Sequence, residues 1–133
     1  MDHLIRAGVF ACVGVAFEVA FTAVAAWRQS GDLRLMGKSY VWMFPIYALA
    51  YPALALLHPL LGGWTLPLRG ACYVLLLYAV EFLSGWLLRR LTGRCPWDYG
   101  SARWAVRGLI RLDFAPAWLL VTLLFERLYL FLI

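Results

Sequence analysis

Long apolar stretches alternate with short polar connectors along the whole chain. Four stretches reach the roughly 20 mainly apolar residues that a helix needs to cross a bilayer. They fall at about residues 4–27, 40–61, 68–88 and 112–133. The pattern therefore predicts an all-α integral membrane protein, a bundle of four transmembrane helices forming one domain over residues 1–133.

Composition strengthens this prediction, because 65% of the residues are apolar and only 14% are charged. A soluble domain is about half apolar and about a quarter charged, so lipid must cover the excess apolar surface. The net charge is +5. Because the cations lie between the apolar stretches, we expect them to face a lipid bilayer with anionic headgroups and not a nucleic acid.

The connector at residues 89–111 is long and strongly basic. Arg103, Arg107 and Arg111 are spaced by four, so on a helix they would share one face. This spacing predicts a short amphipathic helix between the third and fourth spans, lying in the headgroup region. The alternative is a simple basic loop.

Cations are unevenly divided between the two sides of the predicted bundle. The first and third connectors hold nine, and the opposite side holds three: Arg6, Arg69 and Arg127. Basic residues concentrate on the cytoplasmic side of membrane proteins. We therefore expect those connectors to face the cytoplasm, with both termini outside, in a plasma (cytoplasmic or inner) membrane.

Three carboxylates lie inside apolar stretches: Glu18, Glu81 and Glu126. An acid at mid-bilayer costs about 2.5–3.5 kcal/mol, so the bundle must shelter them. Hydroxyl and tyrosine side chains that share their helix faces, Thr22, Tyr78 and Ser84, suggest one polar centre. This predicts a proton- or solute-binding centre. The alternative is hydrogen bonding between helices, with Glu126 paired to Arg127 at the surface.

The second apolar stretch contains Pro45 and Pro52, each of which lacks the N–H that a helix needs. Tyr47 and Tyr51 lie one turn apart, on a face that could reach the polar centre. Broken helices line binding sites in many transporters. The alternative is a kinked helix that serves packing alone.

A run of unusual composition, Cys95-Pro96-Trp97-Asp98-Tyr99, lies in the basic connector. We expect Asp98 to cap a turn, and Trp97 and Tyr99 to anchor the chain at the membrane interface. A nucleophilic Cys95 would need a base nearby, and neither histidine is predicted on that side. The few scattered cysteines and histidines predict no metal site and no cofactor.

This run, together with Glu81-Phe82-x-x-Gly85 and Glu18-Val19-x-Phe21-Thr22, resembles the transmembrane protein 229 family. It also resembles the related bacterial putative ABC-transporter permease (type IV) family. The resemblance covers nearly the whole chain and implies a small multi-pass protein. The sequence contains no P-loop, so an ATPase motor would be a separate partner polypeptide.

Three hypotheses follow. The first is a permease-like, non-enzymatic protein that binds or moves a small solute or ion at the carboxylate centre. The second is a non-catalytic accessory or assembly subunit of a membrane complex. The third is an intramembrane lipid-modifying enzyme, and no arrangement of nucleophilic or metal-binding residues in the sequence supports it. Stripes of small residues also predict a homodimer.

Overall fold

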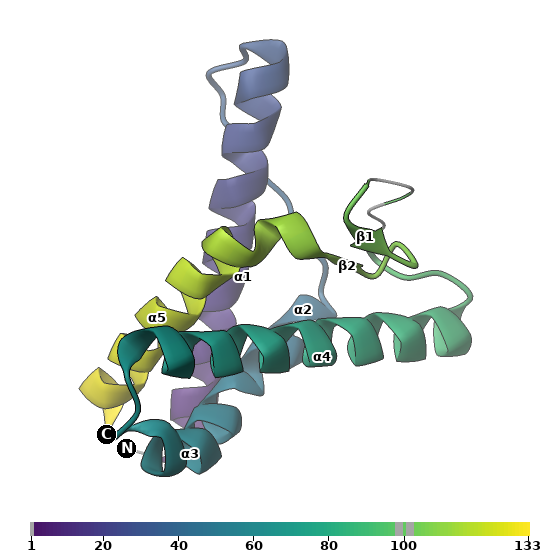
Figure 1. The fold of residues 1–133 in the computed structure, drawn as a ribbon. Coiled ribbons are helices and arrows are strands. Elements are labelled where there is room, and N and C mark those ends of the chain that lie inside the picture. Colours follow the sequence, from purple (N-terminus) through teal and green to yellow (C-terminus); the bar gives the residue numbers. More distant parts are fainter. Residues whose placement is uncertain (1, 98–99, 101–102) are drawn as a thin grey trace. The chain divides into compact units, whose positions relative to one another are not determined.

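A computed structural model describes residues 2–97, 100 and 103–133. It contains four helical segments long and apolar enough to cross a membrane: His3–Ser30, Met43–Leu61, Leu66–Thr92 and Leu112–Leu132. The four predicted spans are therefore confirmed (Figure 1). The chain falls into two compact units, Met1–Leu54 with Leu132 and Ala55–Phe131 with Ile133, which are described separately.

Helix α1 (His3–Ser30) is the main element of the first unit. The Asp2 side chain accepts from the backbone N–H of Leu4 and caps its start. Gly31 ends it in a left-handed conformation (φ 71°), and the Gly31 N–H donates to the carbonyl of Trp27. The helix thus continues three residues beyond the predicted end at residue 27.

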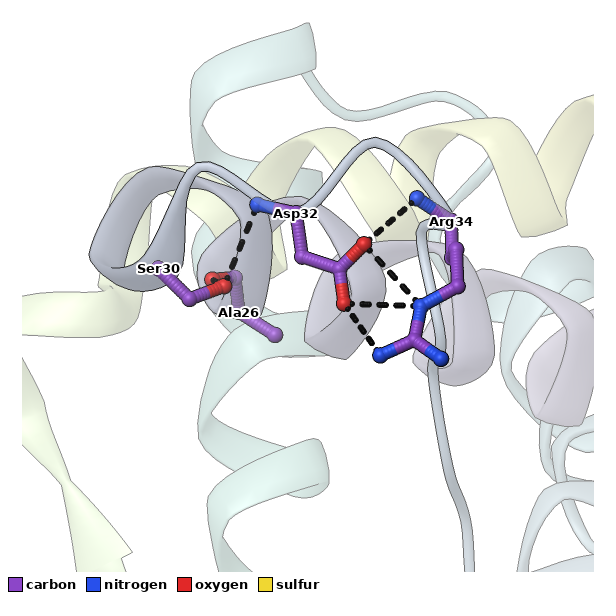
Figure 2. Close-up of polar contacts among 4 residues, drawn as sticks. All are labelled: Ala26, Ser30, Asp32 and Arg34. Carbon is purple, nitrogen blue, oxygen red and sulfur yellow. Dashed lines mark hydrogen bonds and ion pairs between the residues drawn. The ribbon is translucent and has the colours of Figure 1, made fainter.

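A short polar turn follows α1 (Figure 2). The Ser30 hydroxyl donates to the Ala26 carbonyl, and the Asp32 N–H donates to Ser30. Arg34 contacts both Asp32 oxygens through its guanidinium, at 2.8–3.2 Å. These bonds, together with the Arg34 backbone N–H, hold the pKa of Asp32 below its usual value, so the pair remains ionised at neutral pH. The pair is exposed and stabilises the turn only slightly.

The second span is built from two pieces, α2 (Met43–Ala48) and α3 (Ala50–Leu61). Pro45 and Pro52 both fall in the first turn of a piece, where the missing N–H is least costly. Pro52 would clash with the carbonyl four residues before it in a continuous helix, so the break at Leu49 has a steric cause. Pro59 lies inside α3.

The chain between α1 and α2 runs back along α1 in an irregular conformation. The Thr22 hydroxyl donates to the Lys38 carbonyl (3.0 Å) and accepts from the Lys38 N–H (2.8 Å). A Cβ atom on Gly37 would collide with the carbonyl of Val19, so only glycine permits this approach. On the α2 side, the ring of Tyr47 occupies the space that a side chain at position 14 would need, and Gly14 is buried.

The second unit contains α4 (Leu66–Thr92) and α5 (Ala115–Leu132), which follows the single-turn helix η1 (Leu112–Phe114). Gly70 of α4 lies against the side chain of Leu119. Val74, Tyr78 and Ile110 form a buried cluster, against which Ala115 and Trp118 pack. The core of this unit therefore joins α4 to the start of α5 and to the connector between them.

That connector forms a β-hairpin, with β1 (Ala105–Val106) antiparallel to β2 (Ile110–Arg111) (Figure 1). The predicted amphipathic helix is wrong. Arg107 and Gly108 both have positive φ, 54° and 71°, and the Leu109 N–H donates to the Val106 carbonyl. Two left-handed residues in succession make a hairpin turn and cannot occur inside a helix. The spacing of the arginines by four therefore does not place them on one face.

Candidate functional site

Glu126 of α5 lies at the centre of a buried polar cluster in the second unit. The residue is only 4% exposed. Its carboxylate accepts two hydrogen bonds from the Arg69 guanidinium, at 2.6 and 3.0 Å, and one from the Tyr73 hydroxyl at 2.6 Å. A bidentate arginine neutralises the carboxylate and fixes its orientation. These bonds join α5 to the first turns of α4.

The same cluster extends to the segment before α4. Arg69 also donates to the Trp64 carbonyl at 3.0 Å. The His58 ring packs at 5.7 Å from the ring of Tyr129, which is one turn away from Glu126 on α5. Glu126 therefore pairs with Arg69 and not, at the surface, with Arg127, which is exposed. Arg69 was expected only to count among the cations of the outer side, yet it lies inside α4 and pairs with Glu126.

Glu18 in α1 has different surroundings. Its carboxylate accepts a hydrogen bond from the Ser39 hydroxyl at 2.7 Å, and the residue is half-buried. Among the residues that the structure describes, no arginine or lysine forms an ion pair with it. Thr22, one turn further along the same helix, is hydrogen-bonded to the main chain of Lys38. Glu18 thus lies beside irregular backbone, with a neutral hydroxyl as its hydrogen-bond donor.

The two tyrosines of the second span pack against different parts of α1. The Tyr51 hydroxyl lies 2.6 Å from Nδ1 of His3 and accepts from Arg6 at 3.2 Å. Arg6 and Glu18 are twelve residues apart on α1, which is about 18 Å of helix. Tyr47 packs against Gly14, one turn before Glu18, and is buried. The structure therefore places Tyr51 near the start of α1, away from the carboxylate.

Tyr78, Glu81 and Ser84 follow one another along α4, and the connector contacts this part of the helix at Tyr78. The Tyr78 hydroxyl donates to the carbonyls of Arg111 (3.0 Å) and Leu112 (3.2 Å). Glu81 and Ser84 are both half-buried. Glu81 lies close enough to Tyr78 for the two side chains to interact electrostatically. Of these three residues, Tyr78 therefore has its hydrogen-bond acceptors on the segment that follows α4.

Glu81 and Glu126 are associated with different parts of α4. Glu126 is bound at Arg69 and Tyr73, whereas Glu81 lies eight residues beyond Tyr73, about 12 Å along α4. The side chains that bind Glu126 are therefore those of Arg69 and Tyr73 in the N-terminal part of α4. A meeting of Glu18, Glu81 and Glu126 in one centre stays a prediction.

The run that begins at Cys95 fastens the connector to α4. The Trp97 indole N–H donates to the Leu109 carbonyl at 2.9 Å. A Cβ atom on Gly85 would lie about 3 Å from the side chains of Leu109, Trp97 and Cys95, so Gly85 provides the space into which they fit. Trp97 is half-buried and serves this packing as well as any interfacial role. Pro96 is also half-buried, while Asp98 and Tyr99 lie outside the described residues.

The three arginines expected on one helical face occupy different places on the hairpin. Arg103 lies over the Trp104 ring at 5.6 Å, just before β1. Arg107 lies at the tip, where its carbonyl accepts from the Arg89 guanidinium at 3.0 Å. Arg111 pairs with Asp113 at 2.9 Å and lies over the Phe114 ring at 4.6 Å. Each therefore has its own surroundings.

Four apolar spans, with polar groups held between helices and their connectors, define a small multi-pass helical membrane protein. A family model described as Putative ABC-transporter type IV matches residues 8–133, nearly the whole chain. The chain belongs to this family, in agreement with the resemblance carried by Glu18, Glu81 and the Cys95 run. No solved structure matches the chain.

Proposed function

We propose that this membrane protein is a permease-like, non-enzymatic component of a transporter, and that it binds a proton or small cation at Glu18. One observation carries the proposal: Glu18 is a half-buried carboxylate inside a span, and its hydrogen-bond donor is the neutral Ser39 hydroxyl. A carboxylate of this kind can exchange a proton or hold a cation. Glu126 cannot do so without releasing Arg69.

Family membership supports a transport setting. In an ATP-driven transporter the energy comes from nucleotide-binding subunits, and this sequence contains no P-loop. The ATPase would therefore be a separate polypeptide that assembles with this one. Self-association into a homodimer is part of the same proposal, because four short helices enclose little volume alone.

The test replaces Glu18 with glutamine, which keeps size and hydrogen bonding but cannot ionise. The purified chain is reconstituted into liposomes that contain a pH-sensitive dye, and proton entry is recorded under an imposed potassium diffusion potential. We expect Glu18→Gln to reduce protein-dependent proton entry at least tenfold, with unchanged thermal stability. The matched control is Asp32→Asn, which removes an exposed acid of the same unit and should leave proton entry intact.

Unchanged proton entry in a well-folded Glu18→Gln protein would contradict transport at this carboxylate. The accessory-subunit hypothesis would then be preferred, and one observation already favours it. The Arg69–Glu126 pair joins α4 to α5, as expected of an acid that only holds helices together. In that case, copurification with a partner complex would be the informative measurement.

The orientation prediction can be tested with cysteine labelling. In a variant with Cys12, Cys72 and Cys95 replaced by serine or alanine, Arg103→Cys places a thiol on the exposed hairpin. Since that connector is predicted to be cytoplasmic, an impermeant maleimide should label it only after the cells are opened. Labelling of intact cells would reverse the assigned topology.

A further inference from the structure

Arginines gather where α4 ends and the hairpin turn meets it. Arg89 and Arg90 lie in the last turn of α4, and Arg94 follows the Gly93 cap. The Arg89 guanidinium donates to the main-chain carbonyl of Arg107, so the hairpin tip is held beside this helix end. Arg90, Arg94 and Arg107 are exposed, and Arg89 is half-buried. We call these four residues the basic end of α4.

This region has a strong excess of positive charge. Residues 86–107 contain five arginines, which are the four of the basic end of α4 and Arg103, and one acid, Asp98, which gives 5 − 1 = +4. The next acid, Asp113, is engaged with Arg111. The excess at the basic end of α4 therefore calls for an anionic partner.

An exposed aromatic ring accompanies the charge. The Arg90 guanidinium lies 5.1 Å from the centre of the Trp86 ring, and Trp86 is 40% exposed. Tryptophan is enriched at the level of lipid headgroups, where its ring contacts both acyl chains and polar groups. Helix α4 has 27 residues, about 40 Å, against a hydrocarbon core of about 30 Å. Its last turn thus reaches a headgroup layer.

We propose that the basic end of α4 binds the phosphate of an anionic phospholipid headgroup. Guanidinium groups match phosphate oxygens in geometry and charge, and the helix brings them to the depth at which that phosphate lies. The hairpin adds Arg107 to the arginines of α4, so the site depends on the fold and not on net charge alone. It is independent of any transport at Glu18.

The test compares the lipids retained by the full chain in native mass spectrometry. The detergent-solubilised protein is mixed with equal amounts of phosphatidylglycerol and phosphatidylcholine that carry the same acyl chains. We expect phosphatidylglycerol to be preferred. Arg107→Asn should lower the preference about fivefold, as should Arg90→Gln. Asparagine is chosen at 107 because it tolerates the left-handed backbone there.

The matched control is Arg103→Asn, which removes the same charge from the same hairpin at the end away from the tip. It should leave the preference unchanged, and Arg107→Lys should largely retain it. Circular dichroism melting confirms that each variant is folded. An equal loss with Arg103→Asn, or no preference in the wild type, would overturn the proposal. So would displacement of the lipid by millimolar inorganic phosphate, since that would indicate a site for the free anion.

Discussion

Replacing Arg69 with methionine is expected to destabilise the protein by about 3–5 kcal/mol, the usual effect of removing one partner from a buried ion pair. Arg69 is the cation bound to Glu126, and the two side chains are 16% and 6% exposed. Methionine fills similar volume but leaves the carboxylate with the Tyr73 hydroxyl alone. The measurement is the free energy of unfolding in mixed micelles, from a denaturing-detergent titration followed by circular dichroism.

Three variants define the cause of that loss. Arg34→Met breaks the exposed Asp32 pair and should leave stability almost unchanged. Tyr73→Phe removes one hydrogen bond to Glu126 and should cost about 0.6 kcal/mol. The double variant Arg69→Met, Glu126→Leu should recover most of the stability, since it leaves no buried charge. Equal losses for Arg69→Met and Arg34→Met would show that the cluster is not buried in the folded protein.

A side chain at position 14 is expected to separate α1 from α2. A Cβ atom there would overlap the Cβ and ring atoms of Tyr47, which cannot move aside as the tip of a flexible chain could. Gly14→Ala should therefore cost about 1–3 kcal/mol, and Gly14→Leu should prevent the two helices from packing. The same unfolding titration measures both variants.

Gly8 supplies the control on the same helix, because nothing lies within 4 Å of a Cβ atom built there. Gly8→Ala should stabilise the protein by up to about 1 kcal/mol through its better helix propensity. The two substitutions add the same methyl group and differ only in the atoms that surround it. If Gly14→Ala were as well tolerated as Gly8→Ala, the close contact between α1 and Tyr47 would not exist.

The four spans were predictable because each is a long apolar run, and the bilayer sets one length for all of them. Helix ends were less accurate. Residues 28–30 are polar, yet α1 continues until Gly31 adopts the left-handed cap. The division of the second span at Leu49 had a visible sequence signal in Pro45 and Pro52, whose consequence depends on where each helical piece begins.

Of the candidate site, only the acidic residues could be predicted from the sequence. Their depth follows from position in an apolar run, but their partners depend on how segments distant in sequence pack. Arg69 lies 57 residues before Glu126, so spacing along one helix could not reveal the pair. The helix expected from Arg103 to Arg111 does not form, and the reason is local. Arg107 and Gly108 both have positive φ, which makes a turn at the point where the helix would have continued.

The hydrogen bonds that attach the connector to α4 and join its own two ends share one property: the acceptors are main-chain carbonyls. From α4, Tyr78 donates to the carbonyls of Arg111 and Leu112, and Arg89 to that of Arg107. Within the connector, Trp97 donates to the carbonyl of Leu109. A carbonyl is present whatever side chain the residue carries. The exposed positions of the hairpin can therefore exchange their side chains during evolution, while the buried Leu109 and Ile110 and the three donors are constrained. Changes of surface charge along the hairpin are accordingly open to selection without refolding of the unit beneath it.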